Sequence, residues 1–222
     1  MSIKDLATDS AATDDAMLTD LEARILGALM EKQLTTPDAY PLTVNSLLLA
    51  CNQKTSREPI TNLTQGEVQH CLSQMQDRKW VDVDYGSRAH RYDQRLTRVL
   101  GIDKSAQALL NILLLRGPQT VAELFTRSQR MFEFASAESV EEKLQSLCEK
   151  SAPIIVRIPR QPGQREDRYM HLLCGAPDLE ALAAQMTTAK KSSGGELEER
   201  IAILEQQMHA LQQQVEQLLT RA

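Results

Sequence analysis

Apolar positions between residues 19 and 75 predict three amphipathic helices. In each helix, Leu, Ile, Val or Met recurs at intervals of three or four residues, which gathers these side chains on one face. A capping box opens two of the helices: a threonine accepts a backbone N–H, and a glutamate three residues later reaches back to the threonine. The boxes are TDLE at 19–22 and TQGE at 64–67, and Thr43 is the predicted start of the helix between them.

Two strands are expected directly after the third helix. WVDVDY (80–85) alternates apolar and polar residues, GSRAH (86–90) is typical of a turn, and RYDQRL (91–96) is the predicted return strand. Three helices followed by a two-stranded hairpin is the order of elements in a winged-helix domain, whose third helix enters the major groove in DNA-binding members. Residues 19–100 are therefore predicted to form winged-helix domain 1.

The same order of elements recurs over residues 101–175. SAQALLNILLL (105–115) predicts an apolar helix, and a third capping box, TVAE at 120–123, starts a short one. A further helix has Val140, Leu144 and Leu147 on its inner face, and two strands then flank the turn PRQPGQRED (159–167). These residues are predicted to form winged-helix domain 2. We interpret the repeat as one of architecture, because the halves share little residue identity.

The two ends of the chain differ in composition from the middle. Residues 1–18 are rich in Ala, Asp, Thr and Ser and predict a disordered arm. Residues 176–195 predict a short helix and a flexible linker containing KKSSGG. Residues 196–222 carry a heptad repeat that predicts a parallel two-stranded coiled coil and hence a homodimer. Its a and d positions are Leu197, Ile201, Leu204, Met208, Leu211, Val215 and Leu218.

Three runs of the sequence are distinctive: LLLACNQKTSREPI, LLLRGPQT and IVRIPRQPGQREDRYMHLL. Because of these runs, residues 17–175 resemble the YceH-like family of uncharacterised bacterial proteins. The resemblance implies two tandem winged-helix domains, and it implies no activity, substrate or catalytic residue. The predicted fold class is therefore mainly α with small β-hairpin wings, in two tandem winged-helix domains followed by a C-terminal coiled-coil helix.

The charge is unevenly distributed along the chain. The net charge is −5, which disfavours a protein that coats nucleic acid without sequence preference. Both ends are acidic, whereas residues 19–100 hold ten charges of each sign and residues 101–175 hold ten bases and nine acids. A local basic surface on the folded middle is compatible with these numbers.

The third helix of domain 1 is the first candidate site. Gln65 and Gln69 are expected to point outward, and glutamine can bind adenine through two hydrogen bonds in the major groove. The alternative is an ordinary solvated polar face. The basic residues predicted to contact DNA phosphates around this helix are Lys54, Arg57, Arg88 and Arg91.

In domain 2, the third helix and the wing are predicted to carry opposite charges. Its third helix opens with Glu138, Glu141 and Glu142, which would repel phosphates. Its wing is basic, and Glu166 and Asp167 offer local partners for those charges. Phosphate contact and a charge-paired loop are therefore both open for the wing arginines, which are Arg157, Arg160, Arg165 and Arg168.

Enzymatic motifs are not found in the sequence. It contains no GxxxxGK[ST], no GxGxxG after a strand, no GxSxG and no HExxH. Cys51, Cys71, Cys148 and Cys174 form no CxxC pair and are predicted to be buried free thiols rather than zinc ligands. We expect no enzymatic activity, no cofactor and no metal. No apolar run approaches the ~20 residues that span a bilayer, and no leader opens the chain, so a cytoplasmic protein without a membrane partner is predicted.

Two functions from different classes remain open. The first is a homodimeric DNA-binding protein of the transcriptional-regulator kind, with duplex DNA as its partner and domain 1 in the groove. The second is a non-catalytic adaptor that binds a partner protein through tandem winged helices, as in chromosome-organising complexes. The polar third helix of domain 1 and the heptads favour DNA binding. The balanced charge and the acidic third helix of domain 2 favour the adaptor.

Overall fold

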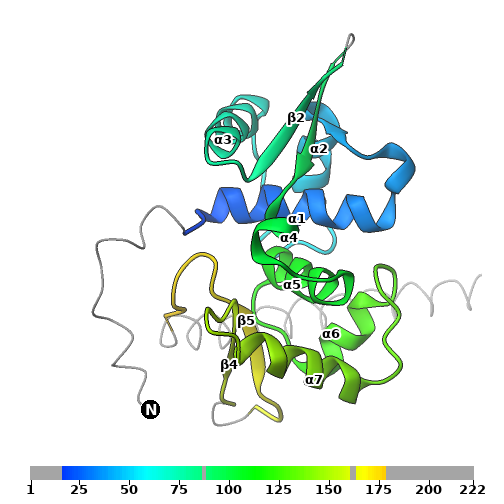
Figure 1. Ribbon diagram of the computed structural model, residues 1–222, viewed down its shortest axis with the longest axis vertical. Coiled ribbons are helices and arrows are strands. Elements are labelled where there is room, and N and C mark those ends of the chain that lie inside the picture. Colours follow the sequence, from blue (N-terminus) through cyan, green and yellow to red (C-terminus); the bar gives the residue numbers. More distant parts are fainter. Residues whose placement is uncertain (1–16, 87–88, 161–163, 179–222) are drawn as a thin grey trace, which may run out of the picture. The chain divides into compact units, whose positions relative to one another are not determined.

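The computed structural model describes residues 17–86, 89–160 and 164–178. The chain divides into two units, 1–176 and 177–222. All the elements below belong to the first (Figure 1). They are mainly helices, with two small antiparallel sheets, as the sequence predicts. Below, "first half" means residues 19–100 and "second half" means residues 101–175.

Several sequence predictions fall on other parts of the chain. The heptad positions from Leu197 to Leu218, the linker and residues 1–16 of the predicted arm lie outside the described residues. Among the residues that are described, none of the helices is both long and apolar enough to cross a bilayer.

The first half contains the helices and the hairpin that the sequence predicts. The antiparallel strands β2 and β3 pair from Val81 with Gln94 to Tyr85 with His90, and β1 joins the other edge of β3. The helices are α1 (Asp20–Thr35), the 3-10 turn η2 (Pro37–Ala39), α2 (Val44–Cys51), α3 (Gln65–Asp77) and α4 (Leu96–Leu100). The strands are β1 (Leu42–Thr43), β2 (Val81–Tyr85) and β3 (His90–Gln94).

The second half repeats this arrangement with fewer strand residues. Its helices are α5 (Lys104–Arg116), α6 (Val121–Ser128) and α7 (Ala137–Cys148), and β4 (Ile155–Ile158) pairs with β5 (Arg168–His171). Gln119, just before α6, forms an isolated antiparallel bridge to Tyr169. Gln119 thus holds the place that β1 holds in the first half, beside the return strand and directly before the second helix.

All three predicted capping boxes are confirmed, and they explain where the helices start. Thr19 accepts from the backbone N–H of Glu22, whose carboxylate accepts in return from the Thr19 N–H at 2.8 Å. The same reciprocal bonds link Thr64 to Glu67 at the start of α3 and the corresponding pair of TVAE at the start of α6. Because both partners of each box lie within one turn, the local sequence is enough to predict these starts.

Three local features differ from the sequence prediction. The strand Leu42–Thr43 is not predicted, because two residues directly before a helix start are too few to show the alternating pattern of a strand. The return strand ends at Gln94, whose side chain accepts from the Thr97 N–H at 3.1 Å and thereby starts α4. Leu18, placed in the disordered arm by its composition, is buried, and its N–H donates to the Leu173 carbonyl at 2.7 Å.

The two halves share one continuous apolar core, centred where α1 packs against α5 (Figure 1). Gly27 permits this approach, because a Cβ atom there would lie only 2.8 Å from Leu115 Cδ2. Polar contacts cross the same junction: Gln33 Oε1 accepts from Gln107 Nε2 at 2.8 Å, and the Glu58 N–H donates to the Leu115 carbonyl at 2.8 Å. The halves therefore form a single packed body.

Candidate nucleic-acid interface

The outward face of α3 is polar and largely without carboxylates. Its inward residues Val68, Leu72 and Met75 are buried, as the periodicity predicts. The exposed glutamate of the face, Glu67, is engaged in the capping box, where hydrogen bonds from Thr64 lower the pKa of its carboxyl. The other exposed side chains of this face before Asp77 are Gln65, Gln69, His70, Ser73 and Gln74.

Helix α7 occupies the corresponding place in the second half, with opposite electrostatic character. Counted from the caps Thr64 and Ser136, its buried Val140, Leu144 and Leu147 match the inward residues of α3. On the outward face, Gln69 and His70 of α3 correspond to Glu141 and Glu142 of α7. All four of these side chains are exposed, so this difference changes what each helix presents to solvent.

The hairpin β2–β3 is attached to the end of α3. Gln76 Nε2 donates to the Tyr85 hydroxyl at 2.8 Å, and the rings of Tyr85 and His90 meet edge to face with 4.9 Å between their centroids. Tyr85 is nevertheless 66% exposed. A large, exposed aromatic side chain is thus held at a defined place beside α3, where it is available to a ligand.

The predicted phosphate contacts of the first half fall into three classes. Lys54 and Arg91 are exposed, and Arg91 Nη1 donates to the Pro41 carbonyl at 2.8 Å. Asp84 lies opposite Arg91 in the strand register, but no carboxylate of the described residues forms an ion pair with Arg91. Arg88 lies outside the described residues. Arg57 is buried.

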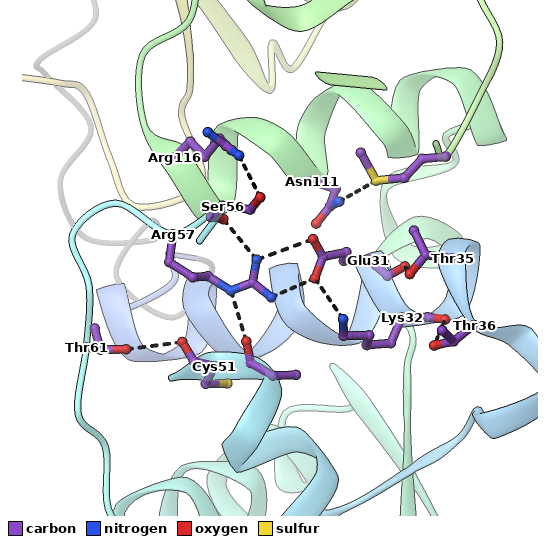
Figure 2. A network of polar contacts seen from close by, with 12 residues as sticks. Glu31, Lys32, Thr35, Thr36, Cys51, Ser56, Arg57, Thr61, Asn111 and Arg116 are labelled. Carbon is purple, nitrogen blue, oxygen red and sulfur yellow. Dashed lines mark hydrogen bonds and ion pairs between the residues drawn. The ribbon is translucent and has the colours of Figure 1, made fainter. Parts of the chain in front are cut away.

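The burial of Arg57 corrects its predicted role as a phosphate contact. Its side chain is 0% exposed and forms an ion pair of 2.6 Å with Glu31, while Nε donates to the Ala50 carbonyl at 2.9 Å (Figure 2). Burial alone would raise the pKa of the Glu31 carboxyl, but the hydrogen bonds and charge of Arg57 outweigh it and lower that pKa. Arg57 therefore serves the fold and is not available to DNA.

The basic hairpin β4–β5 is partly neutralised by acids of the second half. Arg157 forms an ion pair of 2.6 Å with Asp167, which also accepts from the Arg160 N–H at 2.9 Å. These two interactions, the backbone bond first, lower the pKa of the Asp167 carboxyl. Arg168 pairs with Glu123 at 2.9 Å, whereas Arg160 and Arg165 are exposed. Local pairing is thus present for Arg157 and Arg168.

The structure also reveals a repeated motif that the sequence comparison of the two halves missed. Pro41-Leu42-Thr43-Val44-Asn45-Ser46-Leu47 matches Pro118-Gln119-Thr120-Val121-Ala122-Glu123-Leu124 in the pattern PxTVxxL. The return strands match as well, in the dipeptides Arg91-Tyr92 and Arg168-Tyr169. In each half the arginine donates to the carbonyl of the motif proline, at 2.8 and 2.9 Å. Identity between the halves is therefore concentrated where the hairpin meets the second helix.

The four cysteines differ in how deeply they are buried. Cys51 and Cys71 are buried and Cys148 and Cys174 are half-buried, all as free thiols. Burial raises the pKa of Cys51 and of Cys71 to about 12, so both stay protonated near neutral pH. No group of three or more His, Cys, Asp or Glu residues among those described could hold a metal ion.

Comparison with known proteins places the chain in a bacterial family. Residues 18–164 match a family described as "Protein of unknown function, DUF480". A "UPF0502 protein" of Cellvibrio japonicus is 63% identical over 211 residues, covering 94% of this chain and 97% of that protein. A "UPF0502 protein" of Azotobacter vinelandii is 49% identical over 185 residues, covering 83% and 82%. These matches confirm the resemblance to the YceH-like family. The chain belongs to the DUF480, or UPF0502, family of bacterial proteins.

Proposed function

We propose that both halves are winged-helix domains and that the protein is a homodimeric DNA-binding protein of the transcriptional-regulator kind. In this proposal the first half binds duplex DNA. The proposal is supported by the order of three helices and a hairpin in each half, with the hairpin anchored to the third helix in the first half. The heptads from Leu197 to Leu218 would join two chains, because Leu at the d positions favours a parallel two-stranded coiled coil.

The observation that carries the proposal is the contrast between α3 and α7. A helix that enters the major groove passes between two rows of phosphates, where an unpaired carboxylate is repelled and an amide can bind base edges. Gln69 and His70 satisfy this requirement on α3, whereas Glu141 and Glu142 violate it at the same places on α7. We therefore assign base contacts to the first half alone.

Phosphate contacts are assigned to the basic residues that remain accessible. These are Lys54 and Arg91 in the first half and Arg160 and Arg165 in the second, all of them exposed. Arg88, in the turn of the first hairpin, is kept as a candidate from its sequence position. Since the halves share one core, contacts from both would engage one stretch of duplex as a rigid set.

The test exchanges the outward residues of the two helices. Fluorescence anisotropy on random and genomic duplexes, over a series of salt concentrations, would measure binding by the full chain. The double variant Gln69→Glu, His70→Glu gives α3 the charges of α7, and we expect it to weaken binding at least tenfold. The matched control, Glu141→Gln with Glu142→Gln, changes equivalent exposed positions of α7 and is expected to leave base preference unchanged.

Two outcomes would decide against DNA binding by α3. If the wild-type protein does not bind duplexes even at low salt, where attraction to phosphates is strongest, DNA binding is wrong. If it binds and the α3 double variant binds equally well, the groove is contacted by another element. Loss of binding in the α3 variant alone, with an unchanged unfolding midpoint, supports the proposal.

The adaptor remains a second candidate because of one feature of the second half. The exposed face of α7 and its C-terminal end carry Glu138, Glu141, Glu142 and Glu149, beside a wing whose arginines are partly paired with acids. Such a face suits a basic protein partner better than DNA. Affinity purification with the wild-type chain and with the Glu141→Gln, Glu142→Gln variant would test it. A protein that is retained by the first and lost by the second supports the adaptor.

A further inference from the structure

In the second half, the partly exposed carboxylate of Glu123 is held by a backbone N–H and by arginines of α6 and β5. Glu123 Oε2 accepts from the Thr120 N–H at 2.9 Å and from Arg168 Nη1 at 2.9 Å. Arg127 approaches the other carboxylate oxygen at 3.6 Å. Together with the first turn of α6, these donors form a small cationic site, and the chain supplies its own anion to that site.

The first half has the equivalent arginine and helix start without that carboxylate, and Ala50 stands in the place of Arg127. Arg91 donates to the Pro41 carbonyl as Arg168 does to Pro118, and Thr43 caps α2 as Thr120 caps α6. The residue in the place of Glu123 is Ser46. Its N–H donates to Thr43 Oγ1 at 3.3 Å, and the two hydroxyl oxygens are 3.1 Å apart. A neutral, short side chain thus stands where the second half supplies its arginine with a counter-ion.

We propose that Arg91 and the first turn of α2 bind an external anion at the place where Glu123 lies in the second half, and that this anion is a backbone phosphate of duplex DNA. The inference rests on the proposed function and adds to it a defined phosphate site. Arg91, Asn45 and Ser46 are all exposed, so a phosphate can reach them. Helix α2 packs against α3, which places the site on the element next to the proposed reading helix.

Phosphate suits this arrangement for two physical reasons. A helix N-terminus carries partial positive charge and backbone N–H donors, and an adjacent guanidinium adds a full charge with several donors. The carboxylate of Glu123 shows that the threonine N–H and the return-strand arginine, which both halves share, can bind one oxyanion together. Asp84, opposite Arg91 in the register, opposes anion binding and therefore provides a second test of the site.

The decisive variant is Ser46→Glu, which installs in the first half the carboxylate that the second half already has. Because the introduced glutamate would complete a capping box with Thr43, the variant is expected to fold at least as stably as the wild type. The introduced carboxylate should occupy the phosphate site in place of DNA. Duplex binding should therefore weaken about tenfold, and the slope of log K against log salt should become shallower by about 0.9. Arg91→Ala should have the same effect, and Asp84→Asn should strengthen binding.

The control and the measurements separate this inference from the proposed function. Ser146→Glu adds the same charge at an exposed position of α7 and should leave affinity within twofold of the wild type. Anisotropy on duplex DNA over a salt series gives the affinities. Titration of the full chain with inorganic phosphate, followed by the backbone amide resonances of residues 43–46, examines the site without DNA.

Each outcome is decisive. If the wild type binds DNA and Ser46→Glu binds equally well with the same salt slope, the phosphate site is wrong and DNA binding stands. If the wild type binds no DNA at low salt, the proposed function is wrong, and so is the identification of the anion as a DNA phosphate. The phosphate titration then decides about the site: shifts that occur in the wild type and vanish in Ser46→Glu support an anion site, and their absence in both overturns it.

Discussion

The guanidinium of Arg57 is fully shielded from solvent and surrounded by acceptors from three segments of the first half. It donates to both carboxylate oxygens of Glu31, to the Ala50 carbonyl and to the Ser56 carbonyl (Figure 2). Arg116 of α5 donates to Ser56 Oγ at 2.6 Å, which ties the same loop to the second half. A buried charge with so many partners is costly to leave incomplete, so Arg57 makes the loop after α2 a fixed part of the core.

Replacing Arg57 by Ala is therefore expected to destabilise the fold by about 3 kcal/mol, because Glu31 loses its buried partner. Urea unfolding at pH 7 would measure the change, with Lys54→Ala as the control. Lys54 is exposed in the same loop, so its removal should shift the free energy of unfolding by less than about 0.5 kcal/mol. Equal effects of the two substitutions would contradict a structural role for Arg57.

His171 gives the fold a pH dependence of its own. The residue lies in β5, is 6% exposed, and its Nδ1 has no hydrogen-bond partner among the described residues. Burial lowers its pKa from 6.5 to about 4, against a smaller raising effect of Asp20. Between these two values the unfolded chain binds a proton that the folded chain does not, so stability falls as the pH is lowered through this window.

We expect the free energy of unfolding to fall by about 2 kcal/mol from pH 7 to pH 5 because of His171. Acids whose pKa is lowered by folding affect stability only at lower pH. The pKa of Asp103 is lowered from 3.8 to about 2, so its contribution to stability is lost only below about pH 3.8. His171→Gln should remove most of the slope, and the exposed His70→Gln should retain it. Urea unfolding at the two pH values measures this. A His171→Gln protein with the wild-type slope would refute the assignment.

At the scale of elements, the packing of α1 against α5 depends on one glycine. A Cβ atom at Gly27 would lie 2.8 Å from Leu115 Cδ2 and 2.9 Å from Leu115 Cγ, and Leu115 is itself buried. Helix propensity would favour alanine by about 1 kcal/mol, but overpacking a well-packed core costs about 1–3 kcal/mol. The contact between the helices therefore outweighs the local preference.

Gly27→Ala is expected to lower the free energy of unfolding by about 1 kcal/mol, the overpacking cost less the gain in helix propensity. The matched control is Gly66→Ala in α3, where no atom lies within 4 Å of the added methyl group and helix propensity acts alone. That variant should be stabilised by up to about 1 kcal/mol. Thermal unfolding of both variants would show opposite shifts in Tm. A gain in Tm for Gly27→Ala would mean that the two helices separate without cost.

At the scale of the whole molecule, the proposed assembly depends on the C-terminal heptads. Leucine at every d position of residues 197–218 would place an apolar seam on one face of a helix. About three heptads form only a marginally stable coiled coil alone. A dimer through this segment would give two copies of the first half, as a palindromic DNA site requires.

Deleting residues 192–222 is expected to halve the mass measured by light scattering, while the unfolding transition of the two halves persists. Leu204→Asp with Leu211→Asp should do the same, because a charge at a d position cannot be buried cheaply. Gln212→Asp, on a polar position of the same segment, is the control and should leave the mass unchanged. A dimeric mass for the deletion variant would assign the interface to another part of the chain.

The sequence by itself determined the starts of the capped helices and the order of the main elements, but not β1 or α4. Each threonine–glutamate box acts within a single turn. The helical spacing of Val68, Leu72 and Met75 likewise predicts, from residues close in sequence, that these side chains are buried. The hairpins were predictable for the same reason, since alternation and turn residues are local. Family membership also followed from short runs of residues.

Only the tertiary structure decided what the charged residues do. Arg57 and Lys54 lie three positions apart in the same polar loop, yet one pairs with Glu31 in the core and the other faces solvent. The pairing of Arg168 with Glu123 joins segments far apart in the sequence, and so does the bond of Arg91 to the Pro41 carbonyl. The partner of a long charged side chain is set by which distant segments pack together, and no local pattern records it. The strand β1 and the anion site proposed beside it depend on such packing for the same reason.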